Sequence, residues 1–325
     1  MLPDAALAAP RRSWRQRIAP VWRLPLMRLT LAWAAILLIT RHDWLAMAHQ
    51  WWNISTYNHM LTIPAIVAGL VWIRREELAK LDPRIWWPGG IAFAASCGLW
   101  LAGTSLEINT LSQLGAVAAL QASVATVLGL RATLGLLFPL GYMLFLVPVG
   151  GELVPALQMI TASIAITLTR WSGVPAAIDG IMIDTPVGLF EVAEACAGVQ
   201  FLIAMVALGV LVAQSCFHSW RRRTLFLAAC VAVPVLANGV RAWGTIYIAQ
   251  SQGIEFAAGF DHIFYGWVFF ALVIMVVLGA AWRWFDRAPD DPGFDGAALA
   301  ELPMSAGPIV RFALGLRMDR PDQSG

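Results

Sequence analysis

Long apolar stretches alternate with short polar ones along this chain, and the pattern predicts membrane-spanning helices. The hydrocarbon core of a bilayer, about 30 Å thick, takes roughly 20 apolar helical residues. Several apolar segments approach that length and contain few charges. They cover residues 29–46, 60–73, 89–102, 111–130, 133–148, 153–168, 197–214, 224–248 and 263–282. The predicted fold class is therefore an all-α polytopic membrane protein.

The basic residues predict which loops are cytoplasmic, because cytoplasmic loops carry an excess of Lys and Arg. Arginines crowd the N-terminal segment, and further basic groups follow the second, fourth, seventh and ninth apolar segments. All of these basic groups lie on the cytoplasmic side only if one of the nine apolar segments does not cross the membrane. Of the 22 basic residues, only Arg41, Arg170 and Arg241 then lie at the outer side. About eight spans and two cytoplasmic termini are predicted.

The segment that does not cross is expected to be 153–168. Prolines crowd its start, and Gln158, Thr161 and Thr169 recur near helical spacing as a polar stripe. We interpret it as an amphipathic helix lying at the outer membrane surface. Residues 181–192 then alternate loosely around a Thr-Pro-Val-Gly turn, which predicts a small β-hairpin on the same face.

Composition supports this organisation. Hydrophobic residues make up 59% of the 325 residues and charged residues 13%, whereas a soluble domain carries about 25% charged residues. We expect three parts: a basic cytoplasmic segment (1–28), a membrane domain (29–284) and a flexible cytoplasmic tail (285–325). The lipid bilayer is a predicted partner, and no nucleic acid is expected.

Three residues are predicted to meet near the outer face. Cys196 begins one span and His262 begins the last. Arg241 lies about 27 Å along its helix from the cytoplasmic Arg223, at 1.5 Å per residue. Consecutive antiparallel helices can bring all three together.

The chemistry of this set is that of a cysteine nucleophile. A helix N-terminus favours the thiolate of Cys196, and Arg241 can hold a developing oxyanion. His262 can act as base and then as acid. Asn238, three residues before Arg241 on the same helical face, can orient the substrate backbone or the Arg side chain.

Simpler roles fit the other candidates. Cys97 and Cys230 lie inside spans and are expected to be packing residues. Cys216 and His218 form a rival pair, but they lie at the cytoplasmic end, and i, i+2 residues do not face each other on a helix. Glu194 is expected to be solvated. The cysteine spacing favours neither disulfides nor zinc, and no cofactor or metal is expected.

Three short motifs resemble those of the exosortase/archaeosortase family, exosortase A type. They are Glu194-Ala-Cys-Ala-Gly, Ala237-Asn-Gly-Val-Arg241 and Asp261-His-Ile-Phe-Tyr-Gly-Trp-Val-Phe-Phe270. They occur in the family's order, and the resemblance extends over most of the chain to about Phe285. Ala197 and Gln200 depart from the commoner Ser and Arg of the first motif.

The resemblance implies a membrane-embedded cysteine protease or transpeptidase of the bacterial inner membrane. Its substrates are exported proteins with a C-terminal PEP-CTERM-type signal, namely a Pro-Glu-Pro motif, a membrane helix and a basic end. The active site faces the periplasm, and the acceptor that resolves the thioester is unknown. The implied catalytic residues are Cys196, Arg241 and His262, with Asn238, Glu194 and Asp261 in supporting positions.

Two other functions remain open from the residues alone. A transporter or flippase could use Arg241 to bind an anionic substrate, and it would be expected to have helices broken near the midplane. Pro234 lies within the seventh predicted span. A scaffold for envelope polysaccharide export would need no reactivity from Cys196.

Overall fold

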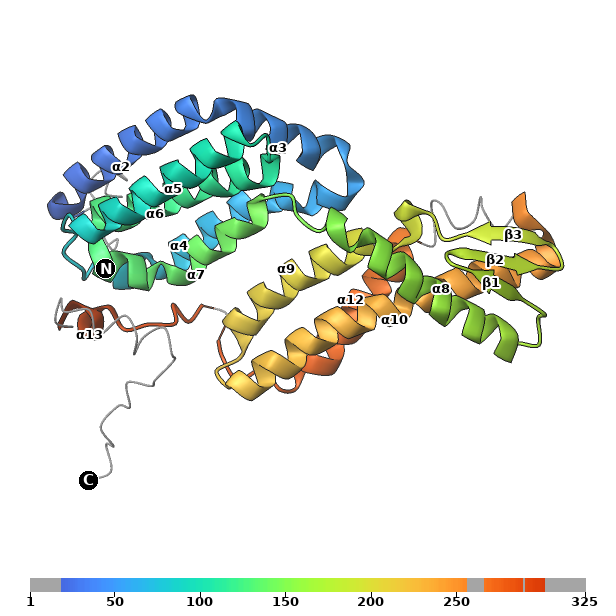
Figure 1. Cartoon of the computed structure of the whole chain (residues 1–325). Coiled ribbons are helices and arrows are strands. Elements are labelled where there is room, and N and C mark those ends of the chain that lie inside the picture. The colour runs from blue at the N-terminus through green and yellow to red at the C-terminus, as the bar shows by residue number, and fades with distance from the viewer. Residues whose placement is uncertain (1–18, 256–265, 289, 302–325) are drawn as a thin grey trace, which may run out of the picture. The chain divides into compact units, whose positions relative to one another are not determined.

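The computed structural model describes residues 19–255, 266–288 and 290–301, and this part is mostly helical (Figure 1). The predicted all-α polytopic fold is confirmed, with one small sheet added to it. The chain forms two compact units. The described residues of the first unit fall within Met1–Leu45, Ile66–Leu144 and Pro292–Gly325, and those of the second fall within Ala46–Ala65 and Phe145–Asp291.

Six helical segments of the described residues are long and apolar enough to cross a membrane. Two shorter apolar helices, Leu137–Leu146 and Val268–Trp282, accompany them. All the apolar segments predicted from the sequence contain helix, although 133–148 is divided between the end of one helix and a short separate one. The six segments are Pro20–Ile39, Ser55–Leu78, Asn109–Gly135, Gly151–Trp171, Glu194–Cys216 and Trp220–Gln252.

The first unit is built around α6, whose side chains are largely buried. Asp43 ties three helices together, because its carboxylate accepts hydrogen bonds from Trp100 Nε1 at 2.8 Å and from Ser112 Oγ at 2.5 Å. Its helices are α2 (Pro20–Ile39), α3 (Arg41–Asn53), α4 (Ile63–Leu78), α5 (Trp87–Ser105), α6 (Asn109–Gly135), α7 (Leu137–Tyr142) and α13 (Gly296–Glu301), with the end of α3 and the start of α4 belonging to the second unit.

Part of the predicted flexible tail is structured. The short helix α13 lies in it, and Gly296 N donates to Glu77 Oε2 at 2.7 Å within the first unit. In the second unit, Arg287 is 8% exposed and its Nε donates to Asp291 Oδ2 at 3.0 Å. The tail is therefore held to the first unit at Gly296, where α13 begins.

The second unit carries the candidate site, and it has a helical hairpin as its core. The aromatic rings of Phe217 and Phe226 lie 5.4 Å apart, and Cys230 is fully buried beside Gly209. Its elements are η1 (Ser55–Thr62), η3 (Gly151–Leu153), α8 (Val154–Trp171), β1 (Ala177–Asp179), β2 (Met182–Thr185), β3 (Gly188–Glu191), η4 (Glu194–Cys196), α9 (Val199–Cys216), α10 (Trp220–Gln252) and α12 (Gly266–Trp282).

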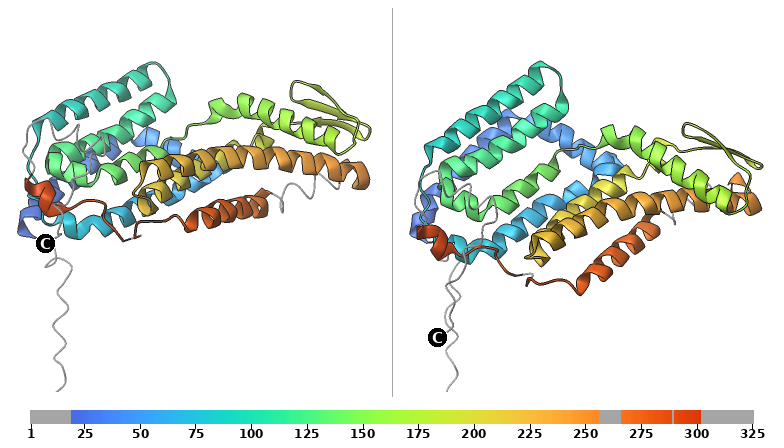
Figure 2. Two further views of the ribbon diagram at one scale, coloured as in Figure 1. Left: turned by 90° about the horizontal axis from the view of Figure 1, so that it is seen from below. Right: turned by 60° about the horizontal axis from the view of Figure 1, so that its bottom comes forward.

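Helix α10 is longer than a span requires. Its 33 residues extend about 50 Å at 1.5 Å per residue, and it continues without interruption through Pro234. Its first half packs against α9 and α12. Its second half packs against α8, which runs in the same direction (Figures 1 and 2). This direction follows from two contacts, Thr161 with Asn238 and Ser172 with Trp243.

The polar stripe of α8 faces the protein. Gln158, Thr161 and Thr169 are 9%, 1% and 1% exposed, so the polar stripe from which we predicted an amphipathic helix is buried against the rest of the protein. These residues instead make hydrogen bonds to α10, to the segment after β3 and to the helix itself. The periodicity of the stripe was read correctly, but a buried polar face and a solvated one produce the same pattern.

The small sheet confirms and extends the predicted hairpin. Strands β2 and β3 pair antiparallel across the Pro186-Val187 turn, with Thr185 opposite Gly188. Strand β1, which was not predicted, pairs with the other side of β2, and the order is β1-β2-β3. The inner face of the sheet packs on α8 and α10 through Ile183 and Val192. The sheet thus leads the chain directly to η4 and Cys196.

Candidate active site

Cys196 ends a tight turn between the sheet and α9. Its N–H donates to Ala193 O at 2.8 Å, and Gly198 precedes the helix with a φ of 78°. A side chain at Gly198 would also collide with Asn238, because a Cβ there would lie 2.7 Å from Asn238 Cγ. Glycine is thus required both by the backbone conformation and by the space. The turn places the partly buried Cys196 just before the first turn of α9.

Asn238 joins the Cys196 turn to two helices. It is 4% exposed, and its Nδ2 donates to Cys196 O at 2.8 Å and to Thr161 Oγ1 at 3.0 Å. Gln158 on α8 holds the segment just before this turn, because its Nε2 donates to Val192 O at 2.8 Å. Thr161 and Gln158 were not predicted as site residues. The polar stripe was the signal that could have identified them.

A cleft of about 450 Å³, open to the surface, contains both Cys196 and Arg241. Arg241 follows Asn238 by three residues on α10, so both side chains lie on one face of the helix. The remaining wall is mostly apolar and comes from the sheet and from the second half of α10. The other lining residues are Ile183, Phe190, Glu191, Val192, Asn238, Ala242, Thr245 and Ile246.

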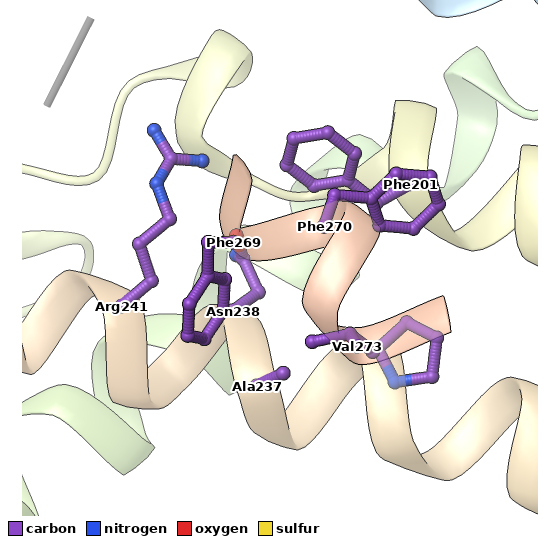
Figure 3. Close-up of a pocket in the computed structure, with 8 residues that line it drawn as sticks. Phe201, Ala237, Asn238, Arg241, Phe269, Phe270 and Val273 are labelled. Carbon is purple, nitrogen blue, oxygen red and sulfur yellow. The ribbon is translucent and has the colours of Figure 1, made fainter. Parts of the chain in front are cut away.

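A second, small hollow adjoins the first, because Asn238 and Arg241 line both. It is lined by aromatic and aliphatic side chains of α9, α10 and α12. Figure 3 shows Phe201 and Phe270 on one side of Asn238 and Arg241 on the other. The Arg241 guanidinium carbon lies 5.9 Å from the centroid of the Phe201 ring. The guanidinium therefore stands where the mixed polar cleft meets an apolar cavity.

The structure brings together three of the predicted site residues, Cys196, Asn238 and Arg241. Glu194 is exposed on η4 and lines neither cavity, which agrees with its expected solvation. His262 and Asp261 lie outside the described residues.

The rival cysteines lie elsewhere. Cys97 is in α5 of the first unit, and Cys230 is fully buried in the α9–α10 core. Cys216 is held at the far end of α9, where its carbonyl accepts from Asp286 N at 3.1 Å. His218 Nε2 lies 3.8 Å from Asp291 Oδ2. Within the described residues no group of three or more His, Cys, Asp or Glu side chains is arranged to hold a metal ion.

These features define a polytopic α-helical membrane protein with a cysteine and an arginine facing one cleft. Residues 51–279 match the family model described as transmembrane exosortase. This range covers most of the chain, and the chain belongs to that family. It includes Cys196, Asn238, Arg241 and His262. No curated protein and no solved structure matches the chain.

Proposed function

We propose that this exosortase is a cysteine protease or transpeptidase that cleaves C-terminal PEP-CTERM-type sorting signals of exported proteins at the outer face of the inner membrane. The observation that carries the proposal is the shared cleft, in which Cys196 and Arg241 lie together while Asn238 anchors the carbonyl of Cys196.

Cys196 is the nucleophile in this scheme. It lies just before α9, where free N–H groups and the positive end of the helix dipole favour a thiolate. The thiolate attacks a backbone carbonyl of the sorting signal, and the guanidinium of Arg241 stabilises the oxyanion that forms. Asn238 is a positioning residue, since its hydrogen bond fixes the main chain that carries the thiol.

His262 completes the chemistry. It donates a proton to the leaving amine as the peptide C–N bond breaks, which leaves a thioester on Cys196. An acceptor amine or hydroxyl, or water, then attacks the thioester and releases the thiol. His262 precedes Phe269, which lines the cavity beside Arg241, by seven residues. That separation lets the chain reach the cleft, because an extended residue spans about 3.5 Å.

The cavity on the far side of Arg241 suits the apolar part of the substrate. Its walls come from Phe201, Phe270 and other apolar side chains of α9, α10 and α12. An apolar side chain at the start of the substrate's membrane helix packs against this aromatic wall, while the polar motif before it occupies the larger cleft. Arg241 then stands near the boundary between the two parts of the signal.

The direction of α10 supports an outward-facing site. Arg221, Arg222 and Arg223 open this helix, and basic residues favour the cytoplasmic side. Arg241 lies about 27 Å farther along, close to the thickness of the bilayer core. The second half of α10, together with α8 and the sheet, then projects on the periplasmic side, with both termini of the chain in the cytoplasm.

A reporter protein with a C-terminal Pro-Glu-Pro, helix and basic tail tests the proposal. Co-expressed with the wild-type chain, the reporter should be shortened, and with Cys196→Ala it should accumulate at full length. Cys97→Ala, in the first unit, is the matched control and should process normally. Wild-type processing by Cys196→Ala would contradict the cysteine mechanism, and the transporter or scaffold function would then lead.

A further inference from the structure

Among the described residues, β3 is an edge strand of the sheet, and it leads straight into the Cys196 turn. Val192 N donates to Ile181 O at 3.0 Å, which extends the β2–β3 ladder by one more pair. Main-chain groups alternate between the two sides of a strand. Leu189 and Glu191 therefore turn their N–H and C=O groups toward the open side of β3.

That open edge offers a short and defined set of groups. The Glu191 carbonyl already accepts from Ala193 N at 3.0 Å. The Leu189 N–H, the Leu189 carbonyl and the Glu191 N–H remain, and none of them has a partner among the described residues. Leu189 is 57% exposed. Unpaired groups at a sheet edge are a ready template for another extended chain.

The edge belongs to the same surface as the nucleophile. The side chains of Phe190 and Val192, which alternate with the outward residues of β3, line the cleft that contains Cys196 and Arg241. A chain lying along β3 would point alternate side chains into this cleft, and its next residues would reach the thiol.

We propose that the extended segment of the sorting signal pairs with the outer edge of β3 as a parallel fourth strand. The proposal rests on the function proposed above. The substrate chain runs from its exported part toward its membrane helix. Strand β3 likewise runs toward η4 and then into α9. Substrate and enzyme chains therefore run the same way past Cys196.

Parallel pairing fixes what the substrate must supply. Consider the substrate residue that lies opposite Leu189. The Leu189 N–H donates to the carbonyl of the substrate residue just before it, and the Leu189 carbonyl accepts from the N–H of the substrate residue just after it. The carbonyl of that following substrate residue also accepts from the Glu191 N–H. The N–H of the substrate residue opposite Leu189 points away from β3. Only one substrate donor is therefore needed at this edge, because the Glu191 carbonyl is already occupied.

A Pro-Glu-Pro sequence meets this requirement. With the first proline opposite Leu189, both proline nitrogens face away from the sheet, where the missing N–H costs no bond. The central glutamate supplies the donor. Its side chain falls on the same face as Phe190 and therefore points into the cleft that Arg241 lines.

Proline substitutions at the two edges of the sheet test the pairing. Leu189→Pro removes the outward N–H without breaking a β2–β3 bond, and it should lower the processing rate about tenfold, since one hydrogen bond is lost. Ile178→Pro is the matched control. Ile178 lies opposite Ile183, whose main chain faces β3, so Ile178 is the outward residue of the other edge, β1. Ile178→Pro should leave processing unchanged. Equal effects of the two substitutions, or no effect of Leu189→Pro, would overturn the proposal.

A disulfide test reads the position independently of cleavage. In a chain with all four native cysteines changed to Ala, Leu189→Cys is paired with a reporter carrying Cys at its first motif proline. Neighbouring strands lie about 4.8 Å apart, within the range of a disulfide. We expect a cross-link between the reporter and Leu189→Cys, and none between the reporter and Ile178→Cys. If the Leu189→Cys cross-link does not form, the docking is refuted. If processing survives Cys196→Ala, the proposed function is refuted. The cross-link then still shows whether the sorting signal binds along β3.

Discussion

The hydrogen bond between Asn238 and Cys196 gives the sharpest test of how the nucleophile is positioned. Asn238→Ala removes both of its buried donors, to Cys196 O at 2.8 Å and to Thr161 Oγ1 at 3.0 Å. Each bond contributes about 0.5–1.5 kcal/mol net, so the free energy of unfolding should fall by about 1–3 kcal/mol. The Cys196 turn also loses its anchor to α10. A small displacement of reacting groups can cost about 100-fold, so processing should fall by roughly 10- to 100-fold.

Thr161→Ala separates stability from position. It removes one of the two bonds but leaves the donor to Cys196 O in place. Stability in detergent should fall by about 1 kcal/mol, while reporter processing stays within about threefold of wild type. Thermal unfolding and the reporter assay are run on both variants. If the two variants lost processing equally, the reasoning would be refuted, because the bond to Cys196 would then have no role beyond stability.

Four further predictions concern the same site. Gly198→Ala should lower both stability and processing in those assays, because the left-handed φ of 78° and the contact with Asn238 leave no room for a methyl. Arg241→Lys should retain little processing, since a lysine cannot present the planar fork of a guanidinium, and His262→Ala should lose roughly 10²- to 10⁴-fold. A membrane-impermeant thiol reagent should label Cys196 in spheroplasts; labelling of Cys216 alone would reverse the orientation.

The sequence predicted the part of the site that depends on local geometry. Asn238 and Arg241 share a helical face because they are three residues apart, and the structure places both beside one cleft. The meeting of Cys196 with them was inferred from depth along antiparallel helices, and in the structure Asn238 Nδ2 donates to the Cys196 carbonyl at 2.8 Å. The β2–β3 hairpin followed from its turn chemistry.

Features that depend on tertiary packing could not be predicted in the same way. The stripe containing Gln158 and Thr161 has helical periodicity whether it faces water or protein, and only the packing of α8 on α10 decides between them. Strand β1 has three exposed residues, so it lacks the alternation that signals a half-buried strand. The special role of Gly198 arises from a side chain 40 residues farther along the chain.

The length of α10 explains why the polar stripe of α8 is buried. A helix of about 50 Å exceeds the bilayer core by about 20 Å, so its two halves meet different surroundings. The first half packs with the apolar α9 and α12. The second half packs with α8 and the sheet, and the contact begins at Asn238. In the orientation proposed above, with Arg221–Arg223 at the cytoplasmic face, this change of partners falls near the outer boundary of the membrane. There a polar peptide can be bound beside lipid, and there the cost of placing an arginine near the membrane is smallest.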